Sequence, residues 1–442
     1  PSSSLTVIDG FIGMWLFFYY EVVIGVSIII TSMVFFFTRL ITFVLPPMLG
    51  YILDRNYTST RQLGKRFFWL IIPSILVPVF CVFLFIPSTS DPGLGLFFFL
   101  VFLGYNILYL YYKINYSAHL LNKFRHPKER LIVSTITSAT DTIGYLFVAL
   151  VTPMLISYGD PSSYIGTAIV VSIFLTITLL LGIPGFLEEE ELLDTYFSSN
   201  LQPQTSFFRD FFKRFGYAFR QKNFILLLIR WLATAVLNLF FVSGTVYYTQ
   251  LFYSSNPMML TSFLLTYNIM IFIAIPIGFL ISWFVGYLRV LNYSGLTLGI
   301  SILLFTFIGA FPSVSYVLFA IAGFSTGLGT VSLIPIAGDT FDESTSINRK
   351  RSEGFLYGLL TLFSSVMSFV YAFVAALVHT STGYTGDPYT PPSGTASFGI
   401  MILFSLIPGI VIISLQIVFM VLYDLKPDKV VSIQQKNKEL QI

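Results

Sequence analysis

The segment Gly50–Arg66, GYILDRNYTSTRQLGKR, is a short polar stretch between two apolar runs, 27–53 and 67–87. Each run is long enough to cross a lipid bilayer as a helix, because about 20 apolar residues span the hydrocarbon core. The stretch between them carries four arginine and lysine side chains, and basic loops are typical of the cytoplasmic side of a membrane. The segment therefore indicates a polytopic membrane protein and predicts how the chain is inserted.

The composition of the whole chain agrees with this interpretation. Of its 442 residues 55% are hydrophobic and only 10% are charged, and the mean hydropathy is +0.82. Soluble globular proteins of this length are far more polar. The single cysteine, Cys81, excludes an intrachain disulfide and a cysteine-based metal site. We expect no cofactor, no bound metal and no nucleic-acid partner.

Apolar runs recur along the chain and predict an all-α polytopic membrane protein with twelve transmembrane helices. Several runs exceed the minimum length, which predicts that their helices are tilted or extend beyond the bilayer. The predicted spans are 5–20, 27–53, 67–87, 94–120, 131–157, 164–185, 223–249, 257–285, 290–311, 313–337, 352–380 and 396–423.

Basic residues are distributed unevenly between the loops of this scheme. Of the 24 arginines and lysines, 21 lie in the loops after the even-numbered spans or in the C-terminal tail, and the loops after the odd-numbered spans hold none. Cytoplasmic loops carry such an excess of positive charge. We therefore expect a multi-pass protein of the cytoplasmic membrane with both termini in the cytoplasm.

The longest polar stretch lies between the sixth and seventh spans and divides the chain into two halves. We predict an N-terminal bundle of six helices at 1–186, a cytoplasmic central loop at 187–222, a C-terminal bundle of six helices at 223–423 and a cytoplasmic tail at 424–442. Paired bundles around a central cavity are frequent in secondary transporters. Within the loop, FFRDFFKRFGYAF alternates aromatic and basic residues and could lie on the inner leaflet.

The segment Gly50–Arg66 resembles the signature loop between the second and third helices of the major facilitator superfamily, with its glycines, its acidic-basic pair and its spaced cations. Three longer segments, TRLITFVLPPMLGYILD, HPKERLIVSTITSATDTIGYLF and GDTFDESTSINRKRSEGFLYGLL, resemble the glycoside–pentoside–hexuronide:cation symporters, the family of the melibiose carrier. This resemblance implies the major facilitator fold, transport by alternating access and a sugar-like substrate. The residues to which it assigns a gating role are Asp54, Arg55, Arg61, Arg351 and Glu353.

The resemblance fails at the positions that bind the coupling cation. The family carries two acidic residues on its second helix as sodium ligands and a lysine on its eleventh helix, but the matching positions here are Thr42, Pro46 and Ser365. Hard cations need several oxygen ligands, normally with a carboxylate among them. Asp9 on the first helix could substitute, although it lies about one turn from the family's position. We therefore predict coupling to protons rather than to sodium.

Three cations, Arg39, Lys113 and Arg230, and one clear acid, Asp141, lie inside the predicted spans. By alignment, Lys113 takes the place of a sugar-binding aspartate of the melibiose carriers, and Asp141 follows the position of their arginine by one turn. Unpaired charges are costly in a membrane, so we expect Lys113 and Asp141 to pair in the bundle interior. The pair either binds the substrate, with Asp141 also carrying the proton, or only clamps two helices together. Arg230 lies nearer the inner end of its helix and could reach the interface.

Further candidates for substrate binding follow from residue type. Tyrosine rings can stack on a polar ligand, and hydroxyl and amide groups can hydrogen-bond to it. Arg39 has a counterpart in the family and is either a ligand or a structural or gating partner. The predicted substrate contacts are Lys113, Asp141, Tyr112, Asn115, Tyr116, Arg39, Asn238 and Asn268.

The sequence thus predicts a secondary active transporter and not an enzyme, because it contains no HExxH motif, no P-loop and no evident nucleophile with a base. The expected partners are membrane lipids, protons and a small polar solute, namely a sugar, a glycoside, a sugar acid or another organic anion, and we expect a monomer. Two alternatives stay open. One is a carrier of lysolipid-like amphiphiles with the same fold, and the other is a receptor or scaffold that moves nothing.

Overall fold

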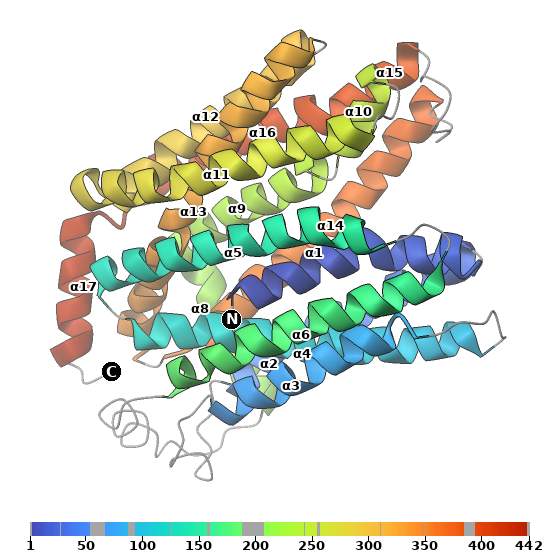
Figure 1. The fold of residues 1–442 in the computed structure, drawn as a ribbon. Helices are drawn as coiled ribbons and strands as arrows, with labels where there is room; N and C mark the ends of the chain where they lie inside the picture. Colours follow the sequence, from blue (N-terminus) through green and yellow to red (C-terminus); the bar gives the residue numbers. More distant parts are fainter. Residues whose placement is uncertain are drawn as a thin grey trace.

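The computed structural model describes residues 2–26, 28–53, 67–86, 93–124, 126–156, 160–187, 207–242, 244–253, 257–309, 311–349, 351–383 and 394–439 (Figure 1). Nearly all of these residues are helical, and the ranges contain no strand. The predicted all-α fold class is therefore confirmed. Three of the predicted gating residues, Asp54, Arg55 and Arg61, lie outside the described residues.

In the described chain, twelve helical units follow the twelve predicted spans. Three of the units contain a π-helical turn, which inserts one extra residue into a helix. The units are α1 (Ser2–Phe18) with η1 (Tyr19–Val23), α2 (Ile28–Leu53), α3 (Phe67–Phe83), α4 (Leu94–Lys123), α5 (Pro127–Leu155), α6 (Pro161–Phe186), α9 (Lys222–Val236) with η3 (Leu237–Val242) and α10 (Thr245–Tyr253), α11 (Pro257–Val285), α12 (Tyr287–Ile308), α13 (Pro312–Asn348), α14 (Glu353–Thr382), and α15 (Gly394–Met401) with η4 (Ile402–Leu406) and α16 (Ile407–Leu422). Two further helices are α8 (Phe207–Arg220) and α17 (Pro427–Glu439).

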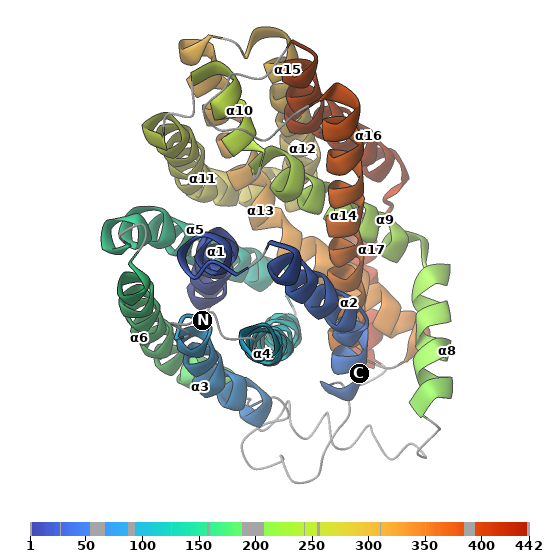
Figure 2. The same cartoon turned by 90° about the vertical axis from the view of Figure 1, so that its right-hand side faces the viewer.

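The units form two groups, α1 to α6 and α9 to α16. The two groups can be told apart in Figure 2, which looks roughly along the helices. The groups meet along two seams, where α2 packs against α14 and α5 packs against α11 and α13. In Figure 1 the groups lie close together at the left and diverge toward the right. The two groups are therefore closer to each other at one end of the helices than at the other.

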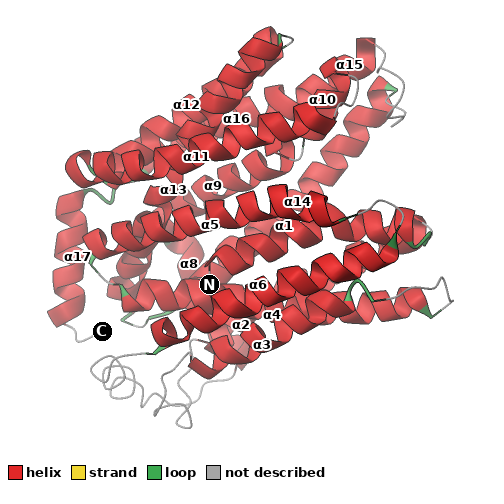
Figure 3. Ribbon diagram, viewed as in Figure 1, coloured by secondary structure: helices red, strands yellow, loops and turns green. Residues whose placement is uncertain are grey.

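Nine helices of the described chain are long and apolar enough to cross a membrane by their length and composition. Their axes are roughly aligned with one another, and the segments that connect them lie at both ends (Figure 3). The three remaining units are shorter in their described apolar parts: α1 and α3 have 17 residues each, and the apolar stretch of α14 runs from Glu353 to Met367. Their positions in the sequence still follow the predicted spans.

The helix α13 is longer than the sequence predicted. The predicted span ended at residue 337, whereas the helix continues to Asn348. Its extra turns carry acidic residues, yet Asp339 and Asp342 are only 2% and 5% exposed because an arginine of α5 lies between them. The helix ends where Arg349 adopts a left-handed conformation with φ 52°.

One end of the molecule holds the last turns of α2, α4, α6, α11, α13 and α16 together with α17, and most described arginines and lysines lie there. We call it the basic end. Here α2 and α14 pack backbone against backbone. A Cβ atom on Gly50 would overlap the carbonyl oxygen of Gly354, and one on Gly358 would overlap that of Pro46. Only glycine allows two helices to approach so closely.

The helices α8 and α17 cover this end from the side. In α8, Phe211 packs edge-on against Tyr51 and Phe355, while Phe212 is 66% exposed. In α17, the Asn437 amide donates a hydrogen bond to the Asp342 carbonyl. The amphipathic character that the sequence predicted for α8 is therefore present, with one face packed on the bundle and one face free of it.

The connection from α16 to α17 is held by a polar cluster. The Asn223 amide and the Lys429 ammonium group both bind the Asp424 carboxylate, at 2.6 and 3.1 Å. Partial burial acts to raise the pKa of Asp424, but these two hydrogen bonds outweigh it and hold that pKa below its ordinary value. The carboxylate therefore stays ionised at neutral pH and keeps α17 tied to α9.

The glycine contact predicts a selective effect of adding one methyl group. We expect Gly50→Ala to weaken the closed contact of α2 with α14 by about 1–3 kcal/mol, as overpacking generally does. Thermal melting of the purified protein in detergent measures this as a lower transition temperature. The matched control is Gly166→Ala in α6, because nothing lies within 4 Å of the added Cβ atom there. Equal melting temperatures for the two variants would show that α2 and α14 do not pack in this way.

Candidate functional site

A cavity of about 490 Å³ lies between the two groups of helices. Its wall comes from α1, α4 and α5 on one side and from α9, η3, α11, α13 and α14 on the other. Cavities of this volume accommodate small molecules. The polar and aromatic residues of the wall are Ser2, Thr6, Asp9, Tyr109, Lys113, Tyr116, Ser117, Thr137, Ser138, Asp141, Thr142, Tyr145, Trp231, Thr234, Asn238, Tyr267, Asn268, Thr326, Thr330 and Tyr357.

The face of α4 that lines the cavity follows the helical repeat. Tyr109, Lys113 and Tyr116 are spaced by four and three residues, so they lie on one side of the helix. Tyr112 and Asn115 lie on other sides and are buried away from the wall. The Tyr112 ring instead stacks on the Tyr116 ring, with centroids 6.0 Å apart. The structure therefore brings Lys113 and Tyr116 to the cavity, but not Tyr112 or Asn115.

Lys113 has its carboxylate partner on α1. Its Nζ lies 3.6 Å from Oδ2 of Asp9, and the Tyr109 hydroxyl donates a hydrogen bond to the same oxygen. The Nζ also lies over the Tyr109 ring, 5.3 Å from its centre. The side chains of Lys113 and Asp9 stay 33% and 45% exposed because both face the cavity. A solute in the cavity can therefore reach both charges.

Asp141 lines the same cavity from α5 but does not pair with Lys113 among the described residues. Its Oδ1 is buried without a hydrogen-bond partner. The helix α1 packs against α5 and stands between it and α4 in Figure 2, and Thr6 of α1 donates to the Asp141 carbonyl at 3.2 Å. The predicted contact of Lys113 with Asp141 is therefore wrong for this conformation, because the intervening helix supplies Asp9.

The opposite wall carries amides and aromatic rings. Asn238 of η3 and Asn268 of α11 line the cavity as predicted. Each amide nitrogen donates to a backbone carbonyl of its own helix, at 3.1 and 2.8 Å, which fixes the direction of the side chain. Trp231, Tyr267 and Tyr357 lie on the same wall. It therefore offers both hydrogen-bonding groups and ring faces.

Arg39 and the positions matched to the family's cation site lie elsewhere. Arg39 is exposed on α2 and is not part of the cavity wall. The hydroxyls of Thr42 and Ser365 donate to carbonyl groups one turn earlier in their own helices, at 2.8 and 3.1 Å. These two hydroxyls are thus engaged with the backbone rather than directed at a common point.

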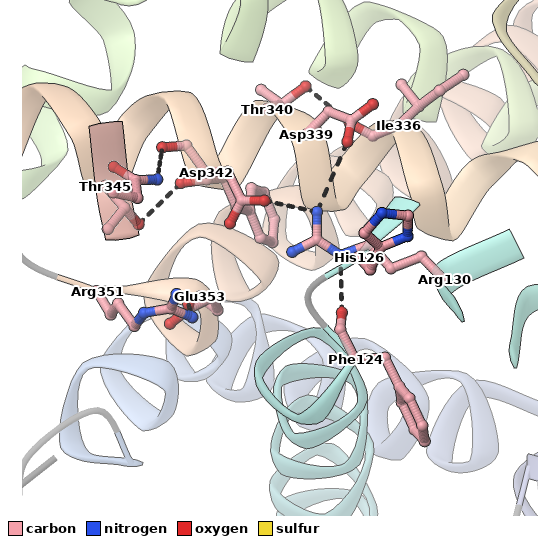
Figure 4. A network of polar contacts seen from close by, with 12 residues as sticks. Phe124, His126, Arg130, Ile336, Asp339, Thr340, Asp342, Thr345, Arg351 and Glu353 are labelled. Carbon is pink, nitrogen blue, oxygen red and sulfur yellow. Dashed lines mark hydrogen bonds and ion pairs between the residues drawn. The ribbon is translucent and has the colours of Figure 1, made fainter. Parts of the chain in front are cut away.

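A buried ionic cluster joins α5 to α13 toward the basic end (Figure 4). Nη1 of Arg130 lies 2.7 Å from Oδ2 of Asp342 and 3.6 Å from Oδ1 of Asp339. The Arg130 Nε donates to the Phe124 carbonyl at 2.9 Å, and the Tyr287 hydroxyl donates to Asp339. The three charged side chains are at most 8% exposed. The cluster therefore links the two groups of helices, and its charged side chains are shielded from water.

The local sequence places Arg130 in this position. The helix α5 begins at Pro127, and the His126 side chain accepts a hydrogen bond from the Lys128 N–H as an N-cap. Arg130 then lies one turn into the helix and points across the seam. A Cβ atom on Gly338 would lie 2.5 Å from the guanidinium carbon, so this glycine leaves the space that the arginine fills.

Two predicted gating residues lie in the same region. Nη1 of Arg351 is 3.1 Å from Oε1 of Glu353, and both side chains are largely buried at the start of α14 (Figure 4). Glu353 adjoins Gly354, whose carbonyl contacts Gly50. Their gating role stays a prediction, but their position beside the seam is compatible with it.

The family model described as "MFS/sugar transport protein" matches residues 1–427. The chain belongs to this family. One relative in the MFS/sugar transport family is the "Isoprimeverose transporter" of Lactiplantibacillus pentosus, 24% identical over 195 residues, which are 43% of this chain but only 40% of that protein. Another is the "Uncharacterized symporter YnaJ" of Bacillus subtilis (strain 168), 23% identical over 406 residues, which cover 90% of this chain and 84% of that protein.

The fold of this MFS chain has a solved counterpart. The structure titled "Crystal structure of a bacterial homologue of iron transporter ferroportin in outward-facing state" matches it with a TM-score of 0.62 and covers 95% of this chain and 97% of that chain. At 14% identity the likeness concerns the fold alone. Together with the family model it confirms the predicted major facilitator fold.

The sequence interpretation missed two kinds of residue at this site. Asp9 and Tyr109 were not assigned to the charge cluster, although Tyr109 lies four residues before Lys113 and the helical repeat could have found it. Arg130, Asp339 and Asp342 lie in segments that the resemblance had singled out, but at the ends of predicted spans, where charged residues are normally solvated. Their burial depends on the seam, which no single segment shows.

The ionic cluster predicts how the basic end is kept closed. We expect Arg130→Gln to leave two buried carboxylates without a cation, a loss of about 3–5 kcal/mol, so that the seam between α5 and α13 opens. The measurement is thiol labelling of Ser134→Cys in a Cys81→Ser background, since Ser134 is fully buried and binds the Thr330 carbonyl across the seam. Labelling should rise at least tenfold with Arg130→Gln and stay low with the control Lys436→Gln, which removes an exposed charge on α17. A labelling rate that Arg130→Gln leaves unchanged would contradict the assigned role.

Proposed function

We propose that this MFS sugar-transport protein carries a sugar or sugar acid across the cytoplasmic membrane by alternating access, with 1–186 and 223–423 as the two moving bodies. The observation that supports this most directly is the cavity of about 490 Å³ between the two groups of helices, with polar side chains from both. A solute bound there contacts both bodies. Rocking of one body against the other then exposes it to either side of the membrane.

The chemistry of the wall suits a sugar. Sugar hydroxyls need hydrogen-bond partners, which Asn238, Asn268 and Thr326 can supply. The C–H face of a sugar ring packs well against aromatic rings such as those of Trp231 and Tyr357. Isoprimeverose, the compound in the name of one relative, belongs to the same class of solute. The Lys113 ammonium group could in addition bind the carboxylate of a sugar acid.

The basic end faces the cytoplasm in this proposal, because cytoplasmic loops carry an excess of positive charge. The Arg130 cluster and the contact of Gly50 with Gly354 then close the cytoplasmic side, and the conformation is outward-facing. The inward-facing state requires these contacts to separate. The seams that hold the basic end together are therefore the gate.

Coupling to protons is assigned to the acidic residues of the cavity wall. Asp141 is free of Lys113 in this conformation, and its Oδ1 lacks a hydrogen bond. Asp9, in contrast, is held by Lys113 and Tyr109. A solute that binds Lys113 would release Asp9, so that both carboxylates become available to protons. The hydroxyls of Thr42 and Ser365, at positions matched to the family's cation site, donate to their own helices, which favours protons over sodium.

The first prediction from this scheme concerns the driving ion. In proteoliposomes, uptake of the transported sugar should be driven at least tenfold by an inward proton gradient and should not change when sodium replaces potassium at constant pH. Uptake of radiolabelled sugar with and without a protonophore measures this. Uptake that needs sodium and ignores the protonophore would refute the proton assignment while leaving sugar transport intact.

The second prediction concerns the pair of Lys113 with Asp9. Both side chains are partly exposed, so Lys113→Ala should reduce stability by no more than about 1 kcal/mol but should reduce uptake at least tenfold. The exchange of Lys113→Asp with Asp9→Lys restores the ion pair without restoring the binding geometry. If Lys113 binds solute, the exchanged protein melts normally and does not transport. Normal uptake by the exchanged protein would mean that the pair is only a clamp between α1 and α4.

The solute screen separates this proposal from its two rivals. Purified protein is tested by thermal shift and by uptake against neutral sugars, sugar acids and lysolipids. A response to lysolipids alone would favour the amphiphile carrier. Binding without flux of any solute would favour a receptor.

A further inference from the structure

Arg230 is a buried cation without an acidic partner. It lies in the transmembrane unit α9 and is only 7% exposed, so its side chain does not extend to the interface as the sequence suggested. Its Nη1 donates to the Thr234 hydroxyl at 3.0 Å, and its Nε is buried without a hydrogen-bond partner. In the part of the chain that the structure describes, no carboxylate forms an ion pair with it.

A small chamber of about 30 Å³ lies beside this guanidinium. Thr234, Thr326 and Thr330 belong both to its wall and to the wall of the main cavity, so the chamber adjoins that cavity. Ser294 and Ser325 add two further hydroxyls, and its wall contains no acidic residue. A cavity needs about 10–15 Å³ of such space to hold one water molecule, so this chamber has room for a water molecule or for an ion of similar size. It therefore suits a small ion or a carboxylate group and is too small for a sugar ring.

A buried arginine in a membrane protein requires a counter-charge. An unpaired cation in a low-dielectric interior is strongly unfavourable, and such residues pair with an anion or mark an ion pathway. Arg130 illustrates the paired case, with two aspartates around it. Arg230 is also buried, at 7% exposed against 1% for Arg130, and has five hydroxyls in the wall of the chamber, but no acidic residue of the described chain pairs with it. The chamber offers space for an anion beside the guanidinium.

We propose that Arg230 and the hydroxyls of this chamber form a binding site for a monovalent anion. The anion is either a free halide or the carboxylate of a solute in the main cavity. The guanidinium supplies charge-assisted hydrogen bonds, and the Thr234 hydroxyl, which accepts from Nη1 of Arg230, keeps its own proton to donate to an anion. Binding of a free halide does not depend on the transported solute, so this inference stands apart from sugar transport.

Thermal melting of the full-length protein in detergent tests the proposal. The protein is equilibrated in sodium sulfate and titrated with sodium chloride or sodium bromide at constant ionic strength. We expect a saturable rise of about 2–4 °C in the melting temperature, because a ligand of the folded state stabilises it. Arg230→Gln should abolish the rise. The matched control, Arg289→Gln, removes an exposed arginine at the start of α12 and should keep it.

A second variant keeps the arginine and removes the space. A Cβ atom on Gly329 would lie 3.1 Å from the Ser294 hydroxyl and 3.8 Å from Nη2 of Arg230. Gly329→Ala should therefore lower the apparent halide affinity severalfold without changing the charge. This variant decides the question if Arg230→Gln does not fold.

The source of the anion is decided by competition. If acetate and glucuronate raise the melting temperature and displace bromide, the chamber holds the carboxylate of a solute, whereas a response to halides alone assigns it to a free halide. Either result requires Arg230 and supports the site. A wild-type protein that no monovalent anion stabilises, or equal stabilisation of Arg230→Gln, overturns it. An uncharged sugar that stabilises the wild type and Arg230→Gln equally would support sugar binding in the main cavity. That result would show that sugar binding does not need Arg230.

Discussion

The contact of Arg130 with Asp339 and Asp342 is the interaction on which the observed conformation depends. In a low-dielectric interior a charge is costly unless it is paired, hydrogen-bonded or close to a water-filled cavity. Here the cation comes from one group of helices and the two acids from the other, so the opposite charges meet only when the basic end is closed. Separation of the groups requires water to reach all three side chains. The closed end is thus defined by desolvation as much as by packing.

Three of the buried or half-buried cations in the described chain meet this constraint in different ways. Arg130 is neutralised by two protein acids and is fully enclosed. Lys113 keeps one acid, Asp9, and remains open to the cavity. Arg230 has hydroxyl neighbours and an adjoining chamber. These three cations therefore divide into one that is enclosed by acids and two that line a cavity, and this division follows from their partners rather than from residue type.

Much of the fold could be predicted from the sequence because the thickness of the hydrocarbon core fixes the length of each apolar run. The spans 27–53 and 257–285 match α2 and α11 nearly residue for residue. The prediction was wrong at the end of α13, where a polar turn stays helical because Arg130 neutralises it. The π-helical turns were also missed, since one inserted residue does not change the hydrophobicity of a run.

The candidate site could be predicted only in part, for a related reason. Lys113, Asp141, Tyr116, Asn238 and Asn268 do line the cavity, because polar residues in apolar spans face the interior. Which residues share a face follows from the helical repeat, which would have excluded Tyr112. The partner of Lys113 could not be inferred, because the position of α1 between α4 and α5 is a property of the packing and not of either helix.

The backbone contact of α2 with α14 has a thermodynamic consequence. At the glycines the two helices touch through carbonyl groups and Cα atoms, so parting them there exposes little apolar side-chain surface. The heat capacity of a conformational change is set mainly by the apolar area that it exposes. This part of the seam therefore contributes little heat-capacity change to opening. The heat-capacity change of opening therefore comes mainly from the other seam, where Leu131 of α5 lies in one buried apolar cluster with Ile275 of α11 and Val331 of α13.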